Sequence, residues 1–208
     1  MKICRTVDEI TAFSRRERQA GRTIGLVPTM GALHAGHLSL VEKSVADTDL
    51  TVVSIFVNPT QFAPGEDLEK YPRDLEGDSR RLEELGVDCL FLPTPEVMYP
   101  PGYATYVVQE ELTSVLCGAS RPTHFRGVLT VVLKLFTIVA PHRAYFGRKD
   151  YQQAALIRQM VRDLALPVPD RVFAYLSLHR ALTRRTMPQP GIVYHTMCNL
   201  SIARLHIG

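Results

Sequence analysis

The amino-acid sequence predicts an α/β fold, a Rossmann-like parallel sheet with helices on both faces. Short apolar runs alternate with amphipathic segments of helical length through the first 168 residues, a pattern typical of crossover units between parallel strands. The run 50–57, "LTVVSIFV", is also apolar almost without interruption, as in strands that are buried on both faces.

A helix is expected near the N-terminus. Thr6 and Glu9 have the spacing of a capping box, and Gly21 can end the helix,. Ile10 and Phe13 begin its apolar stripe. The segments that follow alternate as strand 23–28, helix 37–48, strand 50–57, helix 73–86, strand 88–93, strand 104–109, helix 126–140, strand 143–147 and helix 150–166,.

Two of these helices show clear apolar stripes. The stripe of helix 37–48 consists of Leu38, Val41 and Val45,. That of helix 150–166 consists of Leu156, Ile157, Met160, Val161 and Leu164. Gly86 is expected to close helix 73–86,.

Composition indicates an ordinary globular protein. The chain has 208 residues, 46% of them hydrophobic, which suggests one domain or one domain plus a fragment. We expect a cytoplasmic protein, because no apolar run reaches the ~20 residues of a membrane span and the N-terminus lacks a signal-peptide pattern. Cys4, Cys89, Cys117 and Cys198 form no CxxC pair, so reduced thiols are expected rather than a zinc site or a disulfide framework.

The charge balance changes near residue 168. The net charge is +3, yet residues 169–208 alone contain five Arg, one Asp and no Lys or Glu. Such a change indicates a domain boundary, a disordered tail or sequence not selected for the same fold. We therefore divide the chain into a Rossmann-like domain, residues 1–168, and an atypical tail, residues 169–208.

Three unusual loops each follow the end of a predicted strand. They are 28–37 ("PTMGALHAGH"), 57–74 ("VNPTQFAPGEDLEKYPRD") and 146–153 ("FGRKDYQQ"). Ligands of open parallel sheets bind outside the carboxyl ends of the strands. The three loops are therefore expected to converge on one crevice.

The first loop has the features of a phosphate site. Pro28 and Gly31 are expected to break the strand, and Gly36 allows close approach of the backbone to a ligand. His34 and His37 then lie near a helix N-terminus, which favours anions. The sequence is neither a Walker A loop nor GxGxxG. The alternative is that both histidines are merely polar residues at a helix start.

Together with "YPRD" and "HFRGVLTVVLKLF", these loops resemble the pantothenate synthetases, a family of HxGH nucleotidyltransferases. The resemblance runs from about residue 1 to Val168. It implies an ATP-dependent condensation of pantoate with β-alanine through a pantoyl adenylate, giving pantothenate, AMP and pyrophosphate. It also implies Mg²⁺ with the ATP and a homodimer. Neither nucleic acid nor a membrane is expected as a partner, because the net charge is only +3 and no apolar run is long enough to span a membrane,.

The resemblance assigns roles residue by residue. His37 and His34 are the implied catalytic residues, with His37 in acid catalysis. ATP contacts are implied for Met30, Gly31, Ala32, Leu33, His34, Ala35, Gly36, His37, Gly147, Arg148, Lys149 and Asp150. Substrate contacts are implied for Gln61, Gln153 and Asn58. No metal ligand is named, because Mg²⁺ usually binds the phosphates and water.

Residue chemistry is compatible with these roles. Amides such as Gln61 and Gln153 can both donate to and accept from an acid that carries hydroxyls, and Lys149 can offset phosphate charge. Each has a simpler interpretation as well: Gln153 as a solvated helix residue, Lys149 as a surface charge and Asp150 as an N-cap.

The chain departs from the family in two places. Ala35 stands where the family commonly has Glu, and no counterpart of the Ser-Ser-Arg loop or of the C-terminal domain follows Val168. Residues 169–208 have three possible explanations: first a frameshifted or miscalled reading frame, next a replacement element using Arg184 and Arg185, and third a disordered or partner-binding tail, although its apolar residues argue against complete disorder. Two alternative functions also stay open: a non-catalytic nucleotide-binding remnant and another HxGH nucleotidyltransferase.

Overall fold

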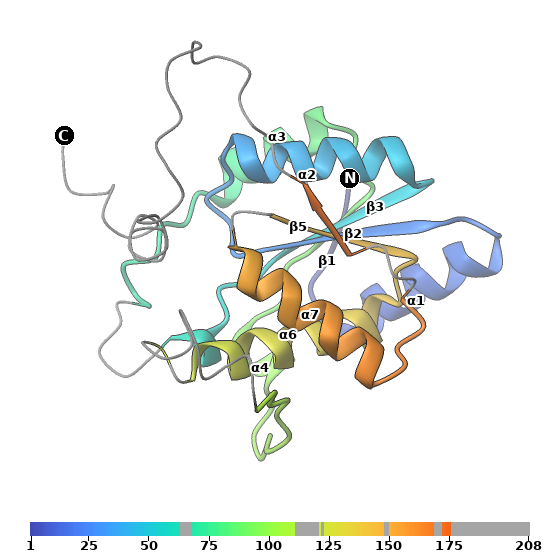
Figure 1. Cartoon of the computed structure of the whole chain (residues 1–208). Coiled ribbons are helices and arrows are strands. Elements are labelled where there is room, and N and C mark those ends of the chain that lie inside the picture. The colour runs from blue at the N-terminus through green and yellow to red at the C-terminus, as the bar shows by residue number, and fades with distance from the viewer. Residues whose placement is uncertain (63–67, 111–120, 122, 148–149, 169–171, 176–208) are drawn as a thin grey trace, which may run out of the picture. The chain divides into compact units, whose positions relative to one another are not determined.

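The computed structural model describes residues 1–62, 68–110, 121, 123–147, 150–168 and 172–175 (Figure 1). All of them belong to a compact unit formed by Met1–Ser177. Arg148, Lys149, Cys117, Cys198 and nearly all of the atypical tail lie outside the described residues. What the sequence predicts for them stays a prediction.

A single parallel sheet forms the centre of this unit, which confirms the predicted fold class. Every neighbouring pair of strands is parallel. In spatial order the strands are β1 (Lys2–Cys4), β4 (Cys89–Phe91), β3 (Leu50–Ile55), β2 (Ile24–Thr29), β5 (Arg143–Gly147) and β6 (Val172–Tyr175). Strand β6 adds to the sheet a segment from beyond residue 168.

Helices cover both faces of the sheet (Figure 1). One face carries α2 (Ala35–Asp47) and α3 (Leu75–Glu84); the other carries α1 (Val7–Gln19), α6 (His124–Val139) and α7 (Tyr151–Asp163). Consecutive strand residues point to opposite faces, and the core divides accordingly. Leu26 and Val52 pack in the cluster with α1, α6 and α7, whereas Val27 and Val53 pack in the cluster with α2 and α3.

The predicted N-terminal helix is confirmed down to its cap. The Glu9 backbone N–H donates to Thr6 Oγ1 at 3.2 Å, and the Thr6 N–H donates to Glu9 Oε2 at 3.1 Å, as in a capping box. Ile10 and Phe13 are buried. Gly21 follows the helix with φ +78°, a conformation that favours glycine.

The predicted apolar stripe of α2 is confirmed at Val41, which is buried, and at Leu38, which packs partly buried against the same cluster, but not at Val45, which is 38% exposed. Leu40 and Ser44 are buried as well. Ser44 Oγ lies 2.8 Å from Thr51 Oγ1, and a Cβ on Gly25 would overlap it. A hydrogen-bonded serine therefore takes the place nearest the sheet, because glycine on β2 lets the helix backbone come close.

The predicted strand 104–109 is wrong. This segment has no regular secondary structure and is not part of the sheet. The Val107 N–H donates instead to Thr130 Oγ1 of α6 at 3.0 Å, so the segment lies along a helix. An apolar, β-branched composition is equally suited to both environments.

Short elements could not be predicted from the sequence pattern. Strand β1, helix α4 (Pro95–Met98) and the 3₁₀ helix η1 (Pro59–Gln61) have three or four residues each, too few to show a period. Leu164 lies beyond the end of α7 and is 50% exposed, so it is not part of the buried stripe.

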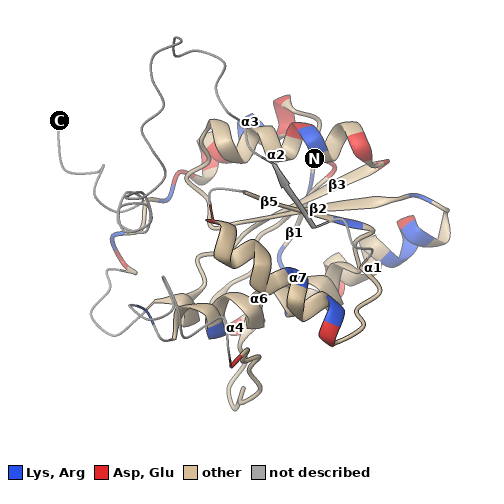
Figure 2. Cartoon of the chain, viewed as in Figure 1, with Lys and Arg blue, Asp and Glu red and all other residues tan. Residues whose placement is uncertain are grey.

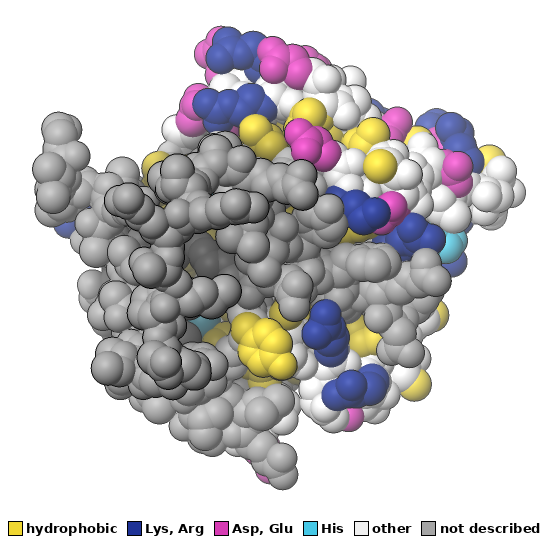
Figure 3. Space-filling view, turned by 45° about the horizontal axis from the view of Figure 1, so that its top comes forward, with side chains coloured by type: hydrophobic (Ala, Val, Ile, Leu, Met, Phe, Trp, Pro, Cys, Tyr) yellow, Lys and Arg dark blue, Asp and Glu magenta, His cyan; other side chains and the backbone are white. Residues whose placement is uncertain are grey.

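The surface of the described residues is mixed in charge. Lys and Arg alternate with Asp and Glu on the outer sides of α1, α2 and α3 (Figure 2). Hydrophobic side chains form small separate patches among the charged ones on the face drawn in Figure 3. Among the described residues, no helix has the length and apolar composition that crossing a membrane requires.

Cys4 and Cys89 are free thiols in the core. Both are fully buried on neighbouring strands, with the sulfur atoms 3.6 Å apart. Burial raises the pKa of the Cys89 thiol, and the proximity of Cys4 adds to the shift. For these two residues the expected reduced state is confirmed.

Candidate functional site

The strand order changes direction between β2 and β5. From β2 the chain passes through α2 to β3 on one side, and from β5 it passes through α7 to β6 on the other side. Both connections leave the carboxyl edge of the sheet (Figure 1). This is a topological switch point, where open α/β sheets bind ligands.

The turn after β2 has an unusual backbone. Gly31 has φ +83° and Ala32 has φ +50°, in the left-handed region that L residues rarely adopt. The Gly31 N–H donates to Thr29 Oγ1 at 3.2 Å, and this hydroxyl donates to the Ser54 carbonyl of β3 at 2.8 Å.

Pro28 does not end the strand as predicted, because β2 continues to Thr29. The β5 ladder has stopped by then, at Leu26. Pro28 has no N–H to donate, and because it lies beyond the last pair of the β2–β5 ladder, no hydrogen bond of that ladder is lost. The chain turns at Gly31 instead.

His34 is the N-cap of α2. Its Nδ1 accepts the Gly36 N–H at 3.0 Å, so Nδ1 carries no hydrogen. In the neutral ring Nε2 is then the donor. A Cβ at position 36 would lie 2.9 Å from His34 Cε1. Gly36 is thus needed for this ring to cap the helix.

His37 lies one turn along the same helix. Its ring stacks on that of His34, with centroids 4.1 Å apart and planes inclined by 28°. Both rings are beside the N-terminus of α2, where backbone N–H groups and the helix dipole attract anions. The arrangement can donate hydrogen bonds to a phosphate.

Two residues of α3, which the sequence reasoning missed, hold this turn. Asp78 is 1% exposed, and its Oδ1 accepts the Leu33 N–H at 2.8 Å. Arg81 Nη1 donates to the Leu33 carbonyl at 3.1 Å. Their spacing of three residues on a helix is the only local signal.

Asn58 begins the second loop and is almost completely enclosed. It is 1% exposed. Its Nδ2 donates to the Gly127 carbonyl at 3.1 Å and to Gln61 Oε1 at 3.0 Å, and its Oδ1 accepts the Tyr99 hydroxyl at 2.9 Å. In this structure Asn58 orients Gln61 rather than facing the crevice itself.

Gln61 connects the first two loops. Its Nε2 lies 3.6 Å from Met30 Sδ, so the turn after β2 and the loop after β3 are in contact. His124 Nδ1 donates to the Gln61 carbonyl at 3.0 Å. A Cβ at Gly127 would overlap the Thr60 carbonyl and lie 2.7 Å from the Gln61 nitrogen, which shows how closely α6 packs on η1.

The third loop leaves the same edge of the sheet at Gly147. Asp150 is the exposed N-cap residue of α7, and no side-chain hydrogen bond caps the helix. Gln153 lies in the first turn of α7 and is partly exposed. Both therefore follow the carboxyl end of β5, with Asp150 exposed and Gln153 partly exposed.

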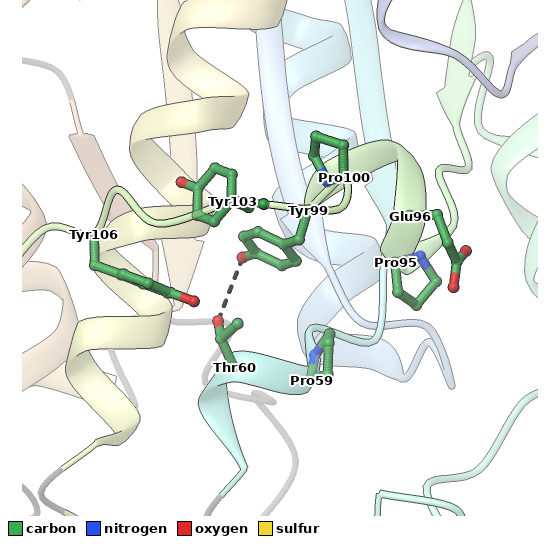
Figure 4. Close-up of a pocket in the computed structure, with 9 residues that line it drawn as sticks. Pro59, Thr60, Pro95, Glu96, Tyr99, Pro100, Tyr103 and Tyr106 are labelled. Atoms are coloured by element: carbon green, nitrogen blue, oxygen red, sulfur yellow. Dashed lines mark hydrogen bonds between the residues drawn. The ribbon is translucent and has the colours of Figure 1, made fainter.

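A cavity of about 340 Å³ adjoins the second loop (Figure 4). Tyr99, Tyr103 and Tyr106 line it with prolines, Thr60, Glu96 and Gly102. Burial raises the pKa of Tyr99 to about 12, and Lys134 Nζ lies 4.6 Å from the Tyr103 ring centroid. None of the predicted ATP or acid contacts lines this cavity, so we place the site at the strand ends.

Among the described residues, no three His, Cys, Asp or Glu side chains form a group that could hold a metal ion. The described donors at the switch point are imidazoles, amides and backbone N–H groups. Such donors suit phosphate and carboxylate oxygens.

Comparisons with known proteins show the family of this chain. A sequence model of the family described as Pantoate-beta-alanine ligase matches residues 2–174. Two relatives named Pantothenate synthetase, from Thermotoga petrophila and Thermotoga neapolitana, are 59% and 58% identical over 168 residues, covering 81% of this chain and 60% of each relative. A third, from Moorella thermoacetica, is 52% identical over 206 residues, covering 88% of this chain and 73% of the relative.

Solved structures resemble the fold. The crystal structure of pantothenate synthetase from Thermus thermophilus has 53% identity and a TM-score of 0.78, covering 84% of this chain and 61% of that one. Pantoate-beta-alanine ligase from Francisella tularensis, complexed with beta-gamma ATP and beta-alanine, has 42% identity and a TM-score of 0.79, covering 84% of this chain and 66% of that one.

The chain spans about 60% of the length of the Thermotoga relatives. The family match nevertheless runs from residue 2 to residue 174, within β6. This chain belongs to the pantoate-beta-alanine ligase family.

Proposed function

We propose that the chain binds ATP at the switch point and condenses pantoate with β-alanine through a pantoyl adenylate. The observation that carries the proposal is the pair of stacked imidazoles at the start of α2, in a loop that contacts Gln61 through Met30. Hydrogen-bond donors suited to phosphate therefore lie near an amide suited to a hydroxy acid. The Francisella relative, complexed with an ATP compound and β-alanine, supports it.

In the first half-reaction, a pantoate carboxylate oxygen attacks the α-phosphorus of ATP. The bond to the β-phosphate oxygen breaks, and pyrophosphate leaves. Negative charge grows on the phosphoryl oxygens as this happens. His34 Nε2–H and the His37 ring offer hydrogen bonds there, which lowers the barrier if they bind the transition state more tightly than ATP itself.

In the second half-reaction, the β-alanine amine attacks the acyl carbon of the adenylate. An amide bond forms, AMP leaves, and the amine loses a proton. Gln61 and Gln153 hold the acids by donating and accepting hydrogen bonds, and Asn58 keeps Gln61 in place. Keeping adenylate and amine in one crevice replaces an encounter in solution.

The other nucleotide contacts are proposed at Met30–His37 and at Gly147, Arg148, Lys149 and Asp150. Mg²⁺ is proposed to accompany ATP on its phosphates, where it neutralises charge. We also propose that the protein is cytoplasmic and forms a homodimer. Sedimentation of the purified chain would check the homodimer.

One second candidate is the binding of ATP without turnover. The stacked imidazoles beside the N-terminus of α2 account for phosphate binding on their own,. Affinity can exist without the reaction, because binding and transition-state stabilisation are separable.

Two measurements on the purified chain separate the candidates. Calorimetric titration with ATP and Mg²⁺ reports binding, and pantoate-dependent exchange between ATP and labelled pyrophosphate reports adenylation. Exchange that requires pantoate supports the ligase. Binding without exchange supports the second candidate, and a folded chain that does neither contradicts both.

A further inference from the structure

We propose that Asp78 is a positioning residue for the nucleotide, acting with Arg81 through the backbone of Leu33. The proposal rests on the proposed ATP site and adds the device that keeps its turn in shape. Neither side chain is assumed to touch ATP.

The geometry is a two-sided hold on one residue of the turn. Asp78 accepts the Leu33 N–H at 2.8 Å, and Arg81 donates to the Leu33 carbonyl at 3.1 Å. Both come from the same face of α3, because residues three apart lie together on a helix. Leu33 immediately precedes His34, so these two hydrogen bonds fix where the helix cap begins.

The turn needs such support. Gly31 and Ala32 both have positive φ, and for alanine this conformation is unfavourable. A Cβ at Gly31 would lie 3.3 Å from Asp78 Oδ2, so this oxygen is close to Gly31 while the other oxygen binds Leu33. The two oxygens of one carboxylate thus lie beside Gly31 and Leu33, the residues on either side of the strained Ala32.

Burying the Asp78 carboxylate costs free energy, and its hydrogen-bond and charge partners offset that cost. A carboxylate that is 1% exposed is unfavourable unless hydrogen bonds and opposite charge accompany it,. Arg81 Nη1 lies 3.5 Å from Asp78 Oδ1. The arginine therefore stabilises the carboxylate and binds the turn at once.

Asp78 also lies near the second loop. Burial and the charge of Asp78 raise the pKa of Tyr71. The Tyr71 ring meets the edge of Phe62, with centroids 6.1 Å apart, and Phe62 ends η1 next to Gln61. The same carboxylate is thus placed between the turn that would bind ATP and the loop that would bind the acids.

Three variants test the role. Asp78→Ala removes the acceptor. Asp78→Asn keeps an oxygen that can accept the Leu33 N–H. The matched control is Asp74→Ala, which removes the N-cap contact to Gly77 on the same helix without contacting the turn. Each variant is compared with wild type by ATP calorimetry, by steady-state kinetics and by thermal unfolding.

We expect Asp78→Ala to weaken ATP binding by about tenfold or more, because displaced contacts lose alignment. Its KM for ATP should rise more than its KM for β-alanine. Asp78→Asn should recover most of the affinity. Asp74→Ala should lower the melting temperature and leave ATP affinity as in wild type. If the role of Asp78 were merely structural, the two variants would change ATP affinity in the same way.

Equal losses in Asp78→Ala and Asp74→Ala, or unchanged affinity in Asp78→Ala, would overturn the proposal. If Asp78→Ala does not fold, Arg81→Ala replaces it, because Arg81 is 41% exposed; unchanged affinity there would equally overturn it. A folded wild type that binds no ATP overturns the proposed function together with this role. Wild-type binding with unaffected variants overturns the role alone.

Discussion

The imidazole of His34 stacks on that of His37 at a centroid distance of 4.1 Å while its Nδ1 accepts the Gly36 N–H. The ring therefore caps the helix through Nδ1, and the phosphate contact that we propose for this residue falls to Nε2. The same side chain therefore stabilises the helix and takes part in the proposed phosphate contact. Substitutions that keep only one of these roles can separate them.

His37→Ala is predicted to lower pantoate-dependent exchange by on the order of 10²-fold, as loss of a transition-state donor does. The N-cap bond belongs to His34, so the fold should persist. Exchange assays and circular dichroism on the same preparation check both statements. An unchanged rate would remove His37 from the mechanism.

His34→Asn and His34→Ala distinguish capping from catalysis. Asparagine is a good N-cap and should keep the free energy of unfolding within about 0.5 kcal/mol, whereas alanine should lower it by about 1 kcal/mol. Both variants lack the Nε2 donor, so both should lower exchange by at least about tenfold. Denaturant unfolding and exchange are measured together. Full activity in the asparagine variant would mean that His34 acts only as a cap.

Gly127→Ala is predicted to destabilise the protein although alanine favours helices. The propensity gain is about 1 kcal/mol, but the new Cβ overlaps the Thr60 carbonyl, and overpacking costs about 1–3 kcal/mol. We expect a net loss in the free energy of unfolding and a raised KM for pantoate, because η1 carries Gln61. Thr137→Ala, on the exposed side of α6, is the control and should not be destabilised beyond about 0.5 kcal/mol. Stability equal to or above wild type in Gly127→Ala would contradict the close packing.

His142 is predicted to make stability depend on pH. Burial, and next the charge of Arg18, lower its pKa from 6.5, and its Nδ1 accepts the Ile24 N–H at 2.9 Å. The folded state therefore binds this proton less readily than the unfolded state. The stabilising contribution is complete above the unfolded value of 6.5 and is lost as pH falls through the lower folded pKa.

The measurement is the free energy of unfolding at about pH 7.5 and about pH 5.5 for wild type and His142→Asn. Asparagine can still accept the Ile24 N–H but does not titrate. The wild type should lose more stability than the variant on acidification. Equal losses would show that other groups cause the pH dependence.

Long elements could be predicted from the sequence because their periodicity extends over several turns. The Thr6 capping box and the apolar run of β3 are local features, and the structure reproduces them. Segment 104–109 was not predictable, because its partner is Thr130 of α6 rather than a strand. The same apolar pattern suits either neighbour.

The candidate site was predictable where its residues follow one another in the chain. The histidines of the first loop are three positions apart at a helix start, and this is visible in the sequence. Asn58 looks like another ligand amide, and only its burial against Gly127 shows that it orients Gln61. Asp78 was missed because its contact with Leu33 spans 45 positions, which no local pattern reports.

The most direct test of the account is pantoate-dependent exchange between ATP and labelled pyrophosphate by this 208-residue chain, with circular dichroism to show that it is folded. Exchange is expected to need pantoate and to fall by on the order of 10²-fold in His37→Ala. A folded wild type that binds ATP but gives no exchange would contradict the ligase function and leave a nucleotide-binding protein in its place.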